Sequence, residues 1–210
     1  MSEIKKPKRV VLATRNAGKV EEFERMLLAA SLNIDVLGLR DFPDMPDVEE
    51  TGSTFAENAL LKARQISEYT GFPALADDSG LSVDALGGAP GIYSARWAGS
   101  HGDDKANLEK VLRQIKELGN PPLSARFTCA IALVFPEDYP VPEREILHEG
   151  VIEGELVLEP RGTHGFGYDP IFQPFGYEQT TAELLPEVKD KISHRGQALT
   201  AILPDLIRLL

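Results

Sequence analysis

Two adjacent carboxylates, Asp77 and Asp78, are the residues of this sequence whose types and spacing point most directly to chemistry. They follow an apolar run, 72–76, that is typical of a buried strand, so we expect them at the strand's end with Gly80 as a turn residue. Adjacent ionised carboxylates repel each other, and burial strengthens the repulsion, so a positive partner is expected nearby. A divalent metal ion with oxygen ligands would serve. The alternative is an ordinary turn, because Asp, Ser and Gly all favour turns.

A second candidate site, for an anion, lies where a predicted strand at 9–13 meets a predicted helix. The connecting residues are Thr14, Arg15, Asn16, Ala17, Gly18 and Lys19. Asn16 is a suitable N-cap, which places the next three residues in the first helical turn. Free amides and the positive end of the helix dipole then face any anion bound there, and Lys19 adds a charge. A capped helix with an exposed lysine would have the same pattern, and the full glycine-rich phosphate-loop motif is absent.

A carboxylate, an amide and an ammonium form a third group, Glu50, Asn58 and Lys62. Asn58 and Lys62 are four residues apart and therefore share one face of a helix. That helix is predicted to begin near Thr54, where Thr54 and Glu57 have capping-box spacing. Glu50 lies just before it and could lean to the same side. The group suits metal and phosphate, but it is also typical of a solvated helix face.

The fourth candidate is split between two segments. Residues 165–169 form a glycine-flanked aromatic loop, in which Phe166 could stack on a flat base. Asp169, together with His194 and Arg195 at the start of the last predicted helix, could hydrogen-bond to the edge of that base. Ordinary loop packing and a surface helix start would explain the same residues without a ligand.

Composition excludes several classes of function. The chain of 210 residues carries 33 acidic and 22 basic side chains, a net charge of −11, which argues against general binding to nucleic acid. We find no apolar stretch long enough for a membrane helix, and the charged amino terminus lacks an apolar signal core. The single cysteine, Cys129, lies in an apolar run and is expected to be buried and structural. These features suggest a cytoplasmic protein.

Hydrophobic periodicity predicts an α/β fold. Helices and strands alternate in the first third of the chain, and strands cluster later. We therefore expect one domain over residues 1–210, built as an elongated two-lobed protein with a central mixed β-sheet flanked by helices and an active-site cleft between the lobes. Helices are predicted at about 17–30, 54–70, 104–118 and from 193, with a kink or restart at Pro204; strands are predicted at 9–13, 72–76, 81–86, 125–135 and 144–158, and loops at 39–52, 136–143 and 160–176.

Five strings of this sequence together resemble the inosine/xanthosine triphosphate pyrophosphatase family. The strings, in the family's order, are TRNAGK at 14–19, ETGSTFAENALLK at 50–62, ADDSGLSVDALGGAPGIYSAR at 76–96, GFGYDPIF at 165–172 and SHRGQAL at 193–199. The third and fourth are highly specific, whereas the first is not. The resemblance runs nearly end to end, without a departure at a functional position.

The resemblance implies a metal-dependent enzyme, usually with Mg²⁺, that splits ITP, dITP or XTP into the monophosphate and pyrophosphate. It implies that Thr14 to Lys19 and Lys62 hold the phosphate chain, and that Glu50, Asp77 and Asp78 handle the metal. Asp78 would be the proton acceptor, and Ser79 would touch the substrate. The implied base pocket consists of Phe166, Gly167, Tyr168, Asp169, Lys189, His194 and Arg195. Members of the family are usually homodimers, acting on a small molecule rather than on nucleic acid or a membrane.

Two other functions remain open on the sequence. An aspartyl phosphatase would also place an aspartate after a buried strand, as a nucleophile, but the usual Asp-x-Asp spacing is absent here. A nucleotide-binding sensor without turnover would need the phosphate and base motifs but not the three acids, and all three are present. Release of orthophosphate would indicate the former, and tight binding without product would indicate the latter.

Overall fold

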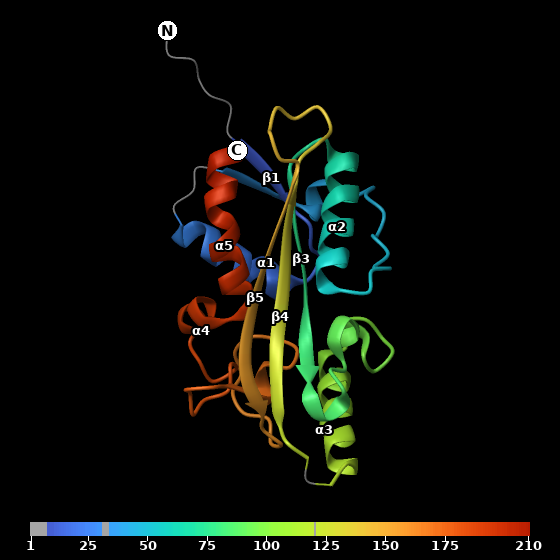
Figure 1. Ribbon diagram of the computed structural model, residues 1–210, viewed down its shortest axis with the longest axis vertical. Helices are drawn as coiled ribbons and strands as arrows, with labels where there is room; N and C mark the ends of the chain where they lie inside the picture. The colour runs from blue at the N-terminus through green and yellow to red at the C-terminus, as the bar shows by residue number, and fades with distance from the viewer. Residues whose placement is uncertain (1–7, 31–33, 120) are drawn as a thin grey trace. The chain divides into compact units, whose positions relative to one another are not determined.

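In the computed structural model, which describes residues 8–30, 34–119 and 121–210, one mixed sheet is flanked by helices (Figure 1). The described strands have the order β2-β1-β3-β4-β5-β6. Strand β1 pairs in parallel with β2 and β3, whereas β5 and β6 are antiparallel. The predicted α/β class is therefore confirmed. The strands are β1 (Lys8–Leu12), β2 (Ile34–Gly38), β3 (Ala74–Val83), β4 (Ser124–Val134), β5 (Glu145–Leu156) and β6 (Phe172–Pro174).

Five α-helices lie in the described part of the chain. They are α1 (Ala17–Ala29), α2 (Phe55–Thr70), α3 (Asp104–Glu117), α4 (Pro186–Ile192) and α5 (His194–Leu209), with shorter 3-10 turns at Leu39–Asp41, Asp84–Leu86, Gly91–Arg96 and Asp169–Ile171. None of the helices within these described ranges is both long and apolar enough to cross a membrane. The charged residues at the amino terminus, 1–7, lie outside the described residues.

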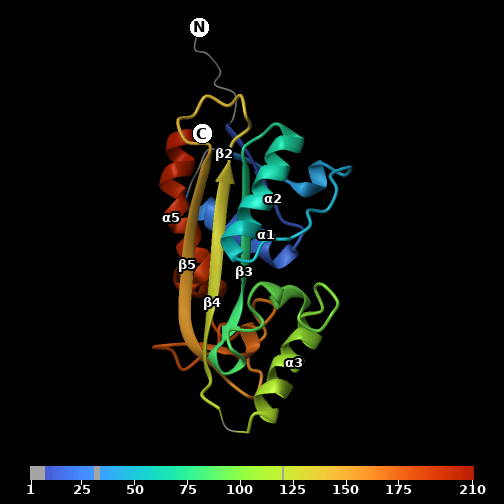
Figure 2. The ribbon, with the colours of Figure 1, turned by 45° about the vertical axis from the view of Figure 1, so that its right-hand side comes forward.

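The chain divides into two compact units. The first unit contains the chain up to Asp77 together with 131–148 and 199–210, and the second unit contains 78–130 and 149–198. In the first unit, β1 and β2 pair from Lys8 with Ile34 to Leu12 with Gly38. Helix α2 and the carboxyl-terminal part of α5 lie on opposite sides of the strands of this unit (Figures 1 and 2).

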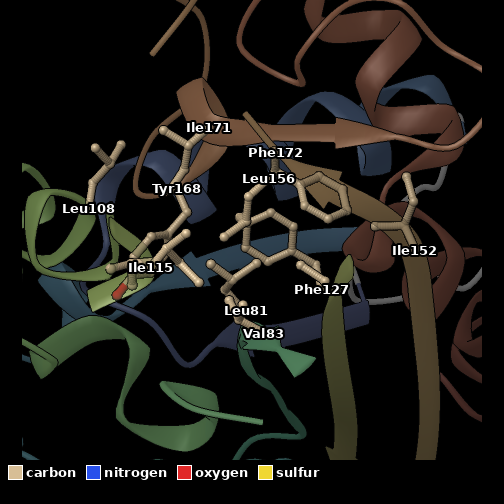
Figure 3. Close-up of a cluster of buried hydrophobic side chains, with 12 residues drawn as sticks. Leu81, Val83, Leu108, Ile115, Phe127, Ile152, Leu156, Tyr168, Ile171 and Phe172 are labelled. Carbon is tan, nitrogen blue, oxygen red and sulfur yellow. The ribbon is translucent and has the colours of Figure 1, made fainter. Parts of the chain in front are cut away.

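The second unit has its own hydrophobic core (Figure 3). Leu108 and Ile115 of α3 enter this core at one end, and Ile152 of β5 lies at the other. The rings of Phe127 and Phe172 lie between them and meet edge to face, with centroids 4.8 Å apart. Burying side chains of this size contributes roughly 1.5–3 kcal/mol each, so this core holds together the segments that carry half of the candidate site.

The predicted helix ends are confirmed where a side chain or a glycine determines them locally. Asn16 caps α1 by accepting a hydrogen bond from the amide of Lys19, and Thr54 caps α2 by accepting one from the amide of Glu57. Gly71 ends α2 with a φ of 70°, a left-handed conformation that glycine adopts at little cost. Helix α3 and strands β4 and β5 also lie where the periodicity predicts them.

The prediction of a strand end and turn at Asp77–Gly80 is wrong. Strand β3 runs without interruption from Ala74 to Val83, and both aspartates are buried within it. Gly80 is present because of a close contact rather than a turn. A Cβ there would lie 2.4 Å from both the Gly91 carbonyl oxygen and the Ser94 hydroxyl oxygen.

Other differences from the predicted elements are smaller. Strands β2 and β6 and helix α4 were not predicted, and residues 84–86 form a 3-10 turn rather than the end of a strand. Helix α5 continues through Pro204 as one helix, so the expected restart does not occur. Proline removes one backbone hydrogen bond, and the buried residues Ile202 and Leu206 hold the helix on either side of it.

Candidate active site

The junction between β1 and α1 is built by short side-chain hydrogen bonds. The Thr14 hydroxyl accepts from the amide of Asn16 at 3.2 Å, and Asn16 Oδ1 accepts from the amide of Lys19 at 3.1 Å. These bonds place Ala17 and Gly18 in the first turn of α1, where backbone amides have no partner within the helix. The junction therefore has the geometry that favours an anion at a helix amino terminus.

Arg15, the remaining residue of this junction, is directed to the segment that precedes Glu50. Its guanidinium donates to the carbonyl oxygen of Met45 at 2.9 Å and lies 3.0 Å from Asp47 Oδ1. The structure thus gives Arg15 a positioning contact that its place in the motif did not reveal.

Lys19 forms an ion pair with Asp77. Lys19 Nζ lies 2.9 Å from Asp77 Oδ2, and the Asp77 side chain is fully buried while that of Lys19 is 15% exposed. The positive partner expected beside the two carboxylates is, in this structure, an ammonium. Neighbouring residues of a regular strand point to opposite faces of the sheet, so β3 gives Asp77 and Asp78 different surroundings.

Lys62 forms a second pair of the same kind, with Glu50. The two charged groups are 2.8 Å apart, and the side chains are 12% and 19% exposed, respectively. The buried Asn58 holds the chain beside this pair, because its Oδ1 accepts a hydrogen bond from the amide of Gly52 at 2.8 Å. The structure therefore brings together the three residues of the predicted group around the start of α2.

The carboxylates of Glu50, Asp77 and Asp78 suit a hard divalent cation, which prefers oxygen ligands. Within the described residues, no three or more His, Cys, Asp or Glu side chains form a group arranged to hold a metal ion. Mg²⁺ is usually bound by one or two carboxylates together with substrate phosphates rather than by a cage of protein ligands. The donor set fits an ion of that kind.

In the second unit, Ser79 is held by Arg195. The buried guanidinium donates through Nη2 to Ser79 Oγ at 2.8 Å. The next part of β3 is fixed by Ser94, whose hydroxyl accepts from the amide of Leu81 at 2.9 Å and donates to the Gly91 carbonyl at 2.6 Å. Asp78 is thereby followed by a stretch of strand with little freedom to move.

The loop at 165–169 is organised around Asp169. Its carboxylate accepts from the amide of Phe166 at 2.8 Å, from Lys189 Nζ at 2.6 Å and from the Thr181 hydroxyl at 2.8 Å. Gly165 must be glycine here, since it has a φ of 74° and a Cβ would lie 2.1 Å from Asp169 Oδ2. Asp169 therefore shapes the loop through these bonds, a role that the motif alone did not indicate.

Two further contacts anchor the same loop. Asp104 at the start of α3 accepts from the amide of Gly167 at 2.9 Å, and the Tyr168 hydroxyl donates to the Ser94 carbonyl at 2.8 Å. Burial raises the pKa of Tyr168 well above its usual range, and the charge of Asp104 adds to the effect.

Phe166 lies among cations. Lys189 Nζ is 5.2 Å and the Arg195 guanidinium carbon 5.6 Å from the centre of its ring. These distances are within the range of cation–π attraction. The ring of His194 is stacked on that of Phe127, which was predicted only as part of a strand. Because Phe127 and Asp104 act from distant parts of the sequence, no local pattern identified them.

The candidate residues fall into two sets that are joined in the chain by the peptide bond between Asp77 and Asp78. The first unit carries Thr14, Arg15, Asn16, Ala17, Gly18, Lys19, Glu50, Lys62 and Asp77, and the second carries Asp78, Ser79, Phe166, Gly167, Tyr168, Asp169, Lys189, His194 and Arg195. The first set combines lysines with carboxylates, and the second combines an aromatic ring with hydrogen-bond donors. The former suits a phosphate chain, and the latter suits a base.

Comparison with known proteins identifies close relatives of this chain. The dITP/XTP pyrophosphatase of Streptomyces coelicolor is 54% identical over 202 residues, covering 96% of this chain and 98% of that protein. The dITP/XTP pyrophosphatase of Bacillus licheniformis is 50% identical over 192 residues, covering 91% and 94%, respectively.

Solved structures show the same relationship. A HAM1 protein from Coxiella burnetii superposes with a TM-score of 0.83 at 45% identity, covering 95% of this chain and 98% of that one. The nucleoside-triphosphatase, or dITP/XTP pyrophosphatase, of Mycobacterium abscessus gives a TM-score of 0.72 at 45% identity, covering 94% and 99%, respectively. The model of the Ham1 family matches residues 10–205. This chain therefore belongs to the Ham1 family.

Proposed function

We propose that this protein hydrolyses the triphosphates of deaminated purines, dITP, ITP and XTP, to the nucleoside monophosphate and pyrophosphate. The observation that carries the proposal is the match over nearly the whole chain to relatives named dITP/XTP pyrophosphatase, at 52% and 54% sequence identity. The residues described above supply the groups that the reaction needs. In the cell, the reaction would remove deaminated purines from the nucleotide pool.

The first unit binds the phosphate chain. The amides at the start of α1 and the ammonium groups of Lys19 and Lys62 contact phosphate oxygens, with Thr14 and Asn16 holding the amides in place. Arg15 contributes by fixing the segment that leads to Glu50. Charge on the leaving pyrophosphate is neutralised in this way, which is the main requirement of phosphoryl chemistry.

Asp78 accepts the proton of the attacking water. It is buried and is followed by a firmly held stretch of β3, so its carboxylate has a defined position. The water attacks the α-phosphorus and the phosphoanhydride bond between the α- and β-phosphates breaks. Pyrophosphate leaves with the electron pair of that bond, without a covalent enzyme intermediate. Glu50 and one of the two aspartates would hold a divalent cation, proposed to be Mg²⁺. When bound, this ion would neutralise phosphate charge and polarise the reacting phosphoanhydride.

The second unit selects the base. Phe166 stacks on the purine, and Arg195, Lys189 and His194 donate hydrogen bonds to its edge. Hypoxanthine and xanthine present an acceptor oxygen at position 6, whereas adenine presents a donor amine. A pocket of donors would leave adenine mispaired, and such mismatches are rejected strongly.

We also propose that the chain folds as a single domain. In this proposal the enzyme is a homodimer and is located in the cytoplasm. The family resemblance supports the dimer, and the shared strands β3, β4 and β5, which contribute residues to both units, support the single domain.

The test is to measure pyrophosphate release from ITP, XTP, ATP and GTP, with Mg²⁺ and with a chelator. We expect release from ITP and XTP that depends on Mg²⁺, with little from ATP or GTP. Orthophosphate as the product would overturn the proposal in favour of a phosphatase. Binding without any product would overturn it in favour of a nucleotide sensor.

A further inference from the structure

Both lysines proposed to bind phosphate already hold carboxylates in this structure. Lys19 pairs with Asp77 at 2.9 Å and Lys62 with Glu50 at 2.8 Å, and all four side chains are at least four-fifths buried. Both pairs belong to the first unit. Two of the three carboxylates assigned to a metal ion, Glu50 and Asp77, are thus neutralised by the cationic groups that would hold the substrate.

In the free protein, each of these two carboxylates is neutralised by a lysine of the same chain. A divalent ion arriving alone would meet carboxylates that are already compensated, and two nearby ammonium groups would repel it. A triphosphate arriving alone would pull both lysines away and leave buried carboxylates uncompensated, which is costly. A complex of ion and triphosphate supplies both new partners at once.

The parts of the site are suited to such an exchange. A lysine ammonium stands on a flexible four-carbon stem and can turn from one partner to another with little change in the backbone. Glu50, by contrast, lies two residues before Gly52, whose amide is bound by the buried Asn58. The carboxylate can therefore keep its place when Lys62 turns away.

We propose that Lys19 and Lys62 occupy Asp77 and Glu50 in the free enzyme and move to phosphate oxygens when a complex of divalent ion and nucleoside triphosphate binds. The site binds the divalent ion together with the triphosphate, and the free enzyme does not hold the ion by itself. This inference rests on the proposed function, because it assigns the phosphate chain to the two lysines.

The test measures binding of Mn²⁺ to the full-length protein without nucleotide, from the electron paramagnetic resonance signal of the unbound ion. In Lys62→Met, Glu50 loses its ammonium partner, and we expect Mn²⁺ to bind at least tenfold more tightly than to the wild type. Adding Glu50→Gln to Lys62→Met should abolish that gain. The control Lys116→Met, on an exposed position of α3, removes the same charge and should leave Mn²⁺ affinity unchanged.

The same substitution should have the opposite effect on nucleotide. Binding of the Mg²⁺ complex of α,β-methylene ITP, in which the reacting bridge oxygen is replaced by carbon, should be at least tenfold weaker in Lys62→Met. Removing one positive charge would thus strengthen metal binding and weaken nucleotide binding, a combination that mere loss of structure does not produce. Lys19→Met provides a second variant with the same two expectations, and thermal denaturation shows which variants fold.

The inference is overturned if the wild type binds Mn²⁺ as tightly as Lys62→Met and Lys19→Met do, or if both variants lose affinity for Mn²⁺. Neither outcome would affect the proposed function, which is tested separately by pyrophosphate release from ITP. Conversely, absence of pyrophosphate release would leave the Mn²⁺ result interpretable, because that measurement uses no substrate.

Discussion

The imidazole ring of His194 lies almost parallel to the phenyl ring of Phe127, with centroids 4.8 Å apart and 11° between the planes. Phe127 is buried in β4 and also meets the ring of Phe172 edge to face. His194 is the first residue of α5, where a side chain on its own could turn in several directions. Stacking on Phe127 fixes its ring, so we assign Phe127 the role of positioning His194 for its proposed contact with the base.

Phe127→Leu should therefore raise the KM for ITP with little change in kcat. The substitution keeps an apolar side chain of similar volume but removes the stacked ring, and aromatic pairs contribute about 0.5–1.5 kcal/mol beyond burial, or roughly 2- to 13-fold in affinity. Steady-state kinetics with ITP measures the effect. Ile152→Val, in the same core, is the matched control and should change stability slightly but not KM. An unchanged KM in Phe127→Leu would rule out the positioning role.

Asp78→Asn should reduce turnover of ITP by about 10²–10⁴-fold, the usual contribution of a general base. The amide has nearly the shape of the carboxylate but cannot accept the proton of water, so nucleotide affinity should change only a few-fold. Pyrophosphate release measures the first effect, and titration calorimetry with α,β-methylene ITP measures the second. Asp138→Asn, on an exposed loop, is the control and should behave as the wild type. Turnover within tenfold of the wild type would remove Asp78 from its proposed role.

The sequence predicts the structure correctly where one local interaction determines it. Asn16, Thr54 and Gly71 mark helix ends through contacts with residues at most four positions away, and the alternation in β5 places its side chains on two faces. Asn58 and Lys62 were also placed correctly on one helix, because residues four apart share a helix face.

The sequence does not predict the structure where a distant segment determines it. Asp77 to Gly80 have turn chemistry locally, but Ser94 and Gly91 fill the space beside Gly80, and the Ser94 hydroxyl accepts a hydrogen bond from the amide of Leu81 in the same strand. Phe127 and His194, whose rings stack, are 67 residues apart in the sequence. The contact of Asp104 with Gly167 spans 63. Such pairings depend on the folded chain and leave no periodic signal in a single sequence.

The buried pair of Asp169 and Lys189 should be strongly coupled in stability. The groups are 2.6 Å apart and almost fully buried, and removing one partner of such a pair typically costs about 3–5 kcal/mol. We expect Lys189→Met to lower the free energy of unfolding by about 3 kcal/mol, or the Tm by roughly 6–12 °C. Asp169→Asn should also destabilise the protein, because it leaves the ammonium buried beside a neutral group.

The double variant Asp169→Asn/Lys189→Met distinguishes coupling from independent losses. Urea denaturation of all four proteins should show the double variant to be more stable than the sum of the single changes implies, by about 1–3 kcal/mol. Strict additivity would mean that the two groups do not stabilise each other. The loop of Phe166 would then depend on the other bonds of Asp169.

Tyr168 should make the protein sensitive to alkaline pH. Its hydroxyl is buried and donates to the Ser94 carbonyl, and burial raises its pKa in the folded state above the value of about 10 that it has when unfolded. Stability from the protonated hydroxyl is therefore fully present below about pH 10. It is lost as the pH rises from there towards the folded-state pKa, by up to about 1.4 kcal/mol per pH unit, since only the unfolded chain releases the proton.

Tyr168→Phe removes this titration. At pH 7 the variant should be less stable by about 1 kcal/mol, because the Ser94 carbonyl loses its donor. Between pH 9 and about pH 11 its free energy of unfolding should fall less steeply than that of the wild type, as measured by urea denaturation at each pH. Tyr69→Phe, at an exposed position in α2, makes the same chemical change and should keep the wild-type slope. Equal slopes for the wild type and Tyr168→Phe would show that ionisation of Tyr168 does not oppose folding.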